Sequence, residues 1–271
     1  MTRDVLLLFL RKELRDLRSN RQVWPAYFFL PAIAVLLPVL LLALLPTFLE
    51  STQNAHNGAT DMLLDTVAHD QTLTGATIAE RLARLLLRDL YAYYLLMPVI
   101  LASSAAALAL VREKEQRTLE PILATPLRDR DLLLAKLVAA AGPALMATWG
   151  SAIAGTLAGM IGSWLRLGTV ILPTAGNLVG LFLLCPAMTA AAALIGLRTS
   201  ARFTDVPGAT QFTGLVVVPL SLIVVAVIGR PAMMFPVVGL GGTVLMGVLS
   251  LWLFRRNVRR FRREEILTRW R

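Results

Sequence analysis

The chain has 271 residues, of which 56% are hydrophobic and only 16% are charged, and its formal net charge is +10. Soluble domains are typically about 45–50% apolar and about 25% charged, so this composition excludes an ordinary soluble enzyme and a disordered chain. The apolar residues form long continuous runs instead of alternating with polar ones, which excludes a transmembrane β-barrel. The sequence therefore predicts an all-α polytopic membrane protein with a single transmembrane domain, residues 1–271.

Residues 1–22 precede the first apolar run and predict an amphipathic helix. Its apolar face holds Leu6, Leu10, Leu14 and Leu17, and its basic residues are distributed over the rest. We expect this helix to lie in the cytoplasmic membrane interface, and a solvated basic leader is the alternative. The segment carries acidic residues and the run that follows is too long, so it is not a signal peptide.

Six stretches of 22 to 31 residues contain no Asp, Glu, Lys or Arg. About 20 apolar residues cross the hydrocarbon core of a bilayer, so each stretch predicts one transmembrane helix. The stretches cover residues 23–48, 90–111, 137–164, 167–197, 206–229 and 231–254. Only Arg230 separates the last two.

Basic residues are divided unequally between the connecting segments. The segments 1–22, 112–136, 198–205 and 255–271 carry 22 Lys and Arg residues, whereas the alternate segments carry 5. The positive-inside rule then places both termini in the cytoplasm of a multi-pass protein of the cell inner or plasma membrane. Residues 255–271 form a basic cytoplasmic tail that we expect to contact anionic membrane lipids. This bias explains the net charge without nucleic-acid binding.

The segment 49–89 is predicted to be extracytoplasmic. Its first part is polar and rich in turn-forming residues, whereas residues 78–90 show helical spacing and are expected to continue into the second span as one long helix. His56 and His69 lie in the polar part, next to several Asp residues. No pair shows the i, i+4 spacing of helical ligands, which favours a polar loop over a metal site.

The sequence shows no catalytic, cofactor-binding or metal-ligating constellation. It lacks a Walker A pattern and an HExxH motif, and Cys185 is its single cysteine. The chain is therefore predicted not to be an enzyme. Ion-coupled carriers keep ionisable residues in the membrane for their function, and none lies in the six stretches. If the chain moves a solute uphill, another chain must supply the energy.

The cytoplasmic loop 112–136 contains a short predicted helix. Thr118 can cap its N-terminus, Pro121 stands where an early helical proline is tolerated, and Pro126 ends it. Its apolar face consists of Leu119, Ile122 and Leu123. A short helix with one apolar side and charged flanks suits docking into a groove on a soluble partner. An ordinary stop-transfer loop is the alternative.

This loop resembles the signature of ABC-2 type ABC transporter permeases. In that family a charged run leads into a Gly-Thr-Leu-Glu-x-Leu-Leu-x-Thr-Pro stretch, and a Gly-Lys pair opens the next span. The matching positions are Glu113, Glu115, Thr118, Leu119, Glu120, Ile122, Leu123, Thr125, Pro126 and Lys136. Arg117 and Ala135 stand where the family has glycine. The resemblance extends more loosely to the basic N-terminal helix and the six spans.

The resemblance implies the permease subunit of an ATP-binding-cassette exporter, which forms the substrate pathway. Two permease copies would pair with two copies of a separate ATPase that holds ATP and Mg²⁺. The loop would be the coupling helix, with the matching positions at the ATPase contact, and residues 1–22 would be the interface helix. The alternatives are a non-transporting ABC membrane subunit that transmits ATPase motion to an extracytoplasmic partner, and a stand-alone secondary carrier. Within the loop we expect Glu120 to be partly buried in the complex and Glu113 to be dispensable.

Overall fold

The structure is a computed structural model, and it describes residues 11–12, 15, 23–54, 65, 67, 75, 77–115, 129–203, 205–226 and 235–260. Throughout these residues the regular structure is helical, without strands. Six helical segments are long and apolar enough to cross a membrane. The predicted all-α architecture with six spans is therefore confirmed.

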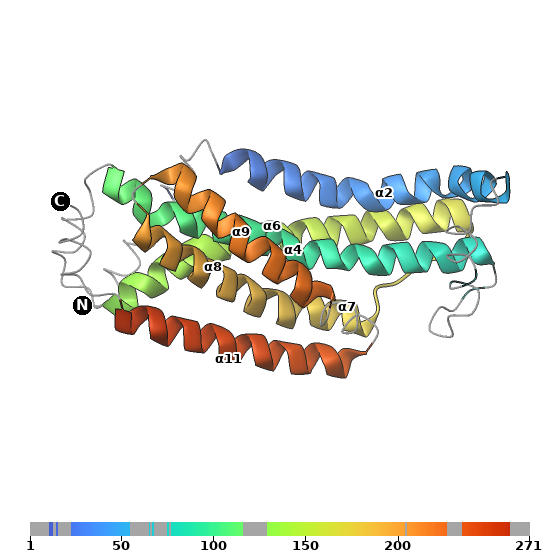
Figure 1. Cartoon of the computed structure of the whole chain (residues 1–271). Coiled ribbons are helices and arrows are strands. Elements are labelled where there is room, and N and C mark those ends of the chain that lie inside the picture. The colour runs from blue at the N-terminus through green and yellow to red at the C-terminus, as the bar shows by residue number, and fades with distance from the viewer. Residues whose placement is uncertain are drawn as a thin grey trace.

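The spans are built from eight helical elements. They are α2 (Trp24–Asn54), α4 (Ile78–Glu115), α6 (Asp129–Leu167), α7 (Ala175–Val179), the π-helical η1 (Gly180–Leu184), α8 (Cys185–Arg202), α9 (Val206–Val224) and α11 (Pro236–Arg260). The elements α7, η1 and α8 follow one another without a break and form one span. Successive spans run in opposite directions along one bundle (Figure 1), so the end of α4 and the start of α6 meet at the same end.

α4 forms the centre of the bundle. It packs against α2, α6, α8 and α9, while α11 packs mainly against α8. In its most apolar 18-residue window 78% of the residues are buried, compared with 22% in α2 and in α9. The outer helices therefore present apolar side chains to their surroundings, as lipid-facing helices do. As predicted, α4 begins at Ile78 and continues through the second span without interruption.

The fourth span begins later than its charge-free stretch. Gly168 has φ +69° and ends α6, with its N–H bonded to the carbonyl of Trp164. Residues 169–174 are not helical, and Thr174 then caps α7 by accepting a hydrogen bond from the N–H of Asn177. A charge-free stretch cannot reveal this break, because the connecting segment is itself mostly apolar.

The π-helical segment η1 lies just before Pro186. Proline has no N–H to donate to the preceding turn. The N–H of Cys185 bonds to the carbonyl of Gly180, five residues back. The carbonyl of Leu181, which would be the equivalent acceptor for residue 186, accepts instead from the indole Nε1–H of Trp149 on α6 at 3.2 Å. Because Pro186 cannot donate to it, the carbonyl of Leu181 is available to the Trp149 indole, and this hydrogen bond joins α6 to the fourth span.

α2, α4 and α6 meet closely at Gly155 of α6. The hydroxyl of Tyr94 on α4 donates to the carbonyl of Ala34 on α2 at 3.0 Å, in a buried position. A Cβ at residue 155 would lie 2.1 Å from Oη of Tyr94 and 2.9 Å from the Ala34 oxygen. The glycine therefore lets the α6 backbone approach both the α2 backbone and the Tyr94 side chain.

Candidate functional site

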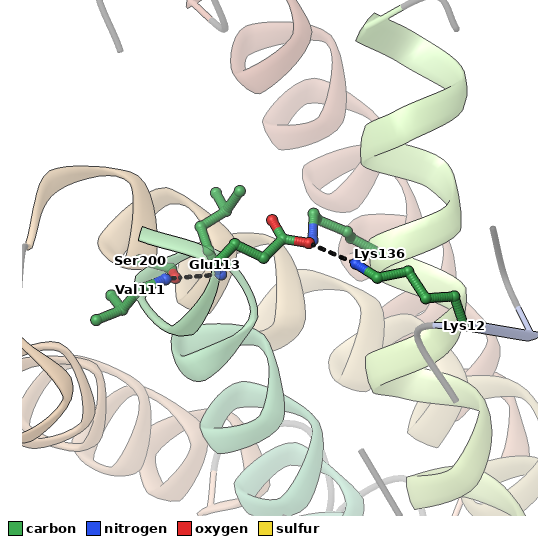
Figure 2. Close-up of polar contacts among 6 residues, drawn as sticks. Lys12, Val111, Glu113, Lys136 and Ser200 are labelled. Carbon is green, nitrogen blue, oxygen red and sulfur yellow. Dashed lines mark hydrogen bonds and ion pairs between the residues drawn. The ribbon is translucent and has the colours of Figure 1, made fainter. Parts of the chain in front are cut away.

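An ion pair joins the two helices that flank the predicted coupling loop. The Nζ of Lys136, near the start of α6, lies 2.8 Å from Oε1 of Glu113, near the end of α4 (Figure 2). The Lys136 side chain is 1% exposed and that of Glu113 is 8% exposed. The two residues are 23 positions apart in the sequence. The pair therefore closes the segment between them into a loop with fixed ends.

Lys12 adds a third charge from the N-terminal region. Its Nζ lies 3.4 Å from the same Oε1 of Glu113, and its side chain is 41% exposed. An exposed ion pair is worth about 0–1 kcal/mol, whereas removing one partner of a buried pair costs about 3–5 kcal/mol. The contact between Glu113 and Lys136 therefore holds the site together, and Lys12 attaches the N-terminal region to it.

The same end of α4 is bound to α8. The hydroxyl oxygen of Ser200 accepts hydrogen bonds from the backbone N–H groups of Leu110 and Val111, at 2.9 and 3.1 Å (Figure 2). Gly196 lies one turn before Ser200 on α8, and a Cβ there would lie 2.5 Å from the carbonyl oxygen of Ser103 on α4. The absence of a side chain at Gly196 lets the two backbones come close, which places Ser200 within reach of α4.

Two of the predicted coupling residues, Glu113 and Lys136, are in contact in the structure. Glu115 belongs to the last described turn of α4. The remaining predicted positions lie outside the described residues, and they are Thr118, Leu119, Glu120, Ile122, Leu123, Thr125 and Pro126. Of the predicted N-terminal helix, the structure describes Arg11, Lys12 and Arg15, all three of them helical.

Glu113 is not a solvated charge, whereas its dispensability for coupling stays a prediction. Its carboxylate is buried against Lys136, so its loss would remove the opposite charge that lies 2.8 Å from a buried ammonium group. The sequence placed both residues just outside the charge-free stretches, where solvated charges are common. Burial arises because α4 and α6 continue past those stretches and pack together.

Sequence reasoning missed the roles of Lys12 and Ser200. Lys12 opens the Lys-Glu-Leu run of the basic N-terminal segment, but that run does not indicate a partner for the lysine, and Ser200 follows an apolar stretch without any motif. Within the described ranges, no three His, Cys, Asp or Glu residues are grouped closely enough to hold a metal ion. The arrangement of Glu113, Lys136 and Ser200 fixes the relative positions of three helices at one end of the bundle.

Comparison with known families places the chain with a family of membrane transporters. A model of the ABC-2 family transporter protein matches residues 7–251, which is nearly the whole chain. The comparison with curated proteins gave no match. The matched region includes Lys12, Glu113, Lys136 and Ser200, so the site described above lies within the family match.

Proposed function

The chain belongs to the ABC-2 transporter family, and from this membership we propose that it is the permease subunit of an ATP-binding-cassette exporter. The chain forms the substrate pathway and does not hydrolyse ATP itself. A separate ATPase subunit binds ATP and Mg²⁺ and contacts the loop 112–136. The complex contains two permease copies and two ATPases in the cell inner or plasma membrane, with both chain termini cytoplasmic.

The buried pair of Glu113 and Lys136 is the observation that supports coupling. A force on the loop between them acts on α4 and α6 together, because separating these two ends would expose or isolate a buried charge. The loop helix then transmits ATPase movement to two spans as a unit. Without the pair, the same movement could be absorbed by bending of the loop ends.

α4 carries this movement to the other end of the bundle. It is one continuous helix from Ile78 to Glu115. Ser200 fixes its cytoplasmic part to α8, and Tyr94 fixes its middle to α2. Packed helices with such specific contacts shift as rigid units. The same continuous helix would also serve the alternative role of transmitting ATPase motion to an extracytoplasmic partner.

The docking role of the loop gives a direct prediction. Leu119 and Leu123 belong to the apolar face that the sequence predicts for the loop helix, and placing charges there would disfavour its burial in a groove of the ATPase. We expect the doubly substituted chain, Leu119→Asp with Leu123→Asp, to insert in the membrane but to lose the copurifying ATPase. The measurement is the amount of Walker A protein recovered with the affinity-tagged, membrane-extracted chain.

A matched control is available in the predicted extracytoplasmic segment. Leu63→Asp with Leu64→Asp makes the same chemical change on the opposite side of the membrane. This variant should retain the ATPase at the level of the unaltered chain. If the loop variant keeps its ATPase, or if both variants lose it equally, the coupling-helix assignment is wrong.

A further inference from the structure

A cavity of about 330 Å³ lies at the end of the bundle opposite to Glu113 and Lys136. Its walls come from the first turns of α4, from α6 around Gly159, from residues 170–174 and from α7. Part of this wall is the non-helical segment between α6 and α7. That segment leaves α6 and leads back to the bundle at α7 (Figure 1). The break in the fourth span therefore makes room for the cavity.

The charged groups in the cavity wall are both cationic. Arg84 and Arg88 lie one turn apart on α4 and both line the cavity. The carboxylates nearest to them in sequence, Glu80 and Asp89, form ion pairs with these arginines but do not line it. Arg88 is 9% exposed, so its guanidinium is held in a weakly solvated position. Guanidinium groups bind phosphate and carboxylate oxygens with matching geometry.

A buried acceptor faces the same cavity. Asn177 of α7 lines it and is 2% exposed, and its amide oxygen has no hydrogen-bond partner among the described residues. A buried polar atom without a partner costs about 1–3 kcal/mol. The neighbouring hydroxyls of Tyr91 and Thr156 bond to each other at 2.8 Å. A ligand with a hydroxyl or amine near its acidic group would supply the missing donor to Asn177.

The remaining wall is apolar. Leu87, Val170, Leu172 and Pro173 line the cavity. Two of them are also exposed at the surface, Val170 by 48% and Leu172 by 65%. These two exposed side chains place apolar surface at the mouth of the cavity. A ligand that fits has an apolar body beside its acidic group, because a fully polar ligand would leave this surface unused.

We propose that this cavity binds an anionic amphiphile, with its phosphate or carboxylate against Arg84 and Arg88 and a hydroxyl or amine donating to Asn177. The ligand comes either from the bilayer, as an anionic phospholipid, or as a free amphiphile. The proposal does not depend on coupling to an ATPase. Its test uses no nucleotide, so its failure would leave the proposed function unaffected.

The test is native mass spectrometry of the full chain purified in a neutral detergent. The chain is incubated with equal amounts of phosphatidylglycerol and phosphatidylcholine, and the bound molecules of each are counted. We expect a preference for phosphatidylglycerol of about tenfold, the ratio that one charge-assisted hydrogen bond provides. In the second arm, dodecyl phosphate replaces both phospholipids and competes with neutral dodecyl maltoside. Binding in the first arm identifies a bilayer lipid, and binding confined to the second identifies a free amphiphile.

Substitutions distinguish this cavity from a general basic surface. Arg84→Gln with Arg88→Gln should abolish the preference, whereas Arg81→Gln should keep it. Arg81 lies on the same helix and carries the same charge, but its Nε–H donates to the carbonyl of Gly75 and it does not line the cavity. Val170→Trp narrows the mouth at an exposed position, so it tests the cavity without altering a buried arginine.

We expect Val170→Trp to reduce binding several-fold in a folded chain. Equal binding of anionic and neutral amphiphiles in both arms would overturn the proposal. A preference that survives both the double arginine substitution and Val170→Trp would also overturn it, because the anionic ligand would then bind elsewhere.

Discussion

Gly155→Ala should lower the free energy of unfolding by about 2–6 kcal/mol. Its new methyl group would collide with the hydroxyl of Tyr94 and the carbonyl of Ala34. Overpacking costs about 1–3 kcal/mol, and a displaced buried hydrogen bond adds about 1–3 kcal/mol. The loss should appear as earlier unfolding of the purified chain in a denaturant titration in mixed micelles.

Two further variants identify the cause. Gly150 lies on the same helix, and a Cβ there would have no atom within 4 Å. The Gly150→Ala chain should therefore be no less stable than the unaltered chain, and more stable by up to about 1 kcal/mol because alanine favours a helix. Tyr94→Phe removes the closest atom and should recover part of the stability of the Gly155→Ala chain in a double-mutant cycle. An equal loss at residues 150 and 155 would show that the contact with Tyr94 does not cause the effect, because alanine favours the helix over glycine at both positions.

Breaking the pair of Glu113 and Lys136 should destabilise the chain by about 3–5 kcal/mol. Glu113→Gln leaves the Lys136 ammonium buried without its carboxylate, and Lys136→Met leaves the carboxylate buried without its ammonium. The double variant Glu113→Gln with Lys136→Met removes both charges and should be more stable than either single variant. Thermal unfolding in detergent, followed by intrinsic fluorescence, measures all three.

Lys12→Met is the matched control for this pair. It removes a lysine that contacts the same Oε1 of Glu113, but its side chain is largely solvated. Its effect should be about 0–1 kcal/mol. If Lys12→Met and Lys136→Met destabilise the chain equally, burial does not decide the strength of these contacts. The buried pair would then not be what holds the ends of α4 and α6 together.

The overall architecture could be predicted because it depends on one strong physical requirement. A charged residue in the hydrocarbon core is costly, so the absence of charges marks the six spans. The continuation of α4 from Ile78 was also predictable, because the apolar spacing of residues 78–90 is helical. Both features can be predicted from the composition and residue spacing of a single segment.

The site was predicted less well because it depends on contacts between segments. The family signature singles out Glu113 and Lys136, but it does not show that they pair, and the packing of α4 against α6 buries them. Arg84, Arg88 and Asn177 come together because the fourth span begins at Ala175 and residues 168–174 turn back toward α4. A single sequence shows neither the depth of a side chain nor which helices are neighbours.

ATP turnover by the purified permease–ATPase complex tests the central proposal most directly. Glu120→Gln changes one acidic group in the proposed coupling helix, and Glu264→Gln makes the same change in the C-terminal segment. We expect the Glu120→Gln complex to keep its ATPase but to turn over ATP several-fold more slowly, while Glu264→Gln has no effect. Equal turnover in both variants and in the isolated ATPase would contradict the proposal that this loop couples the permease to ATP hydrolysis.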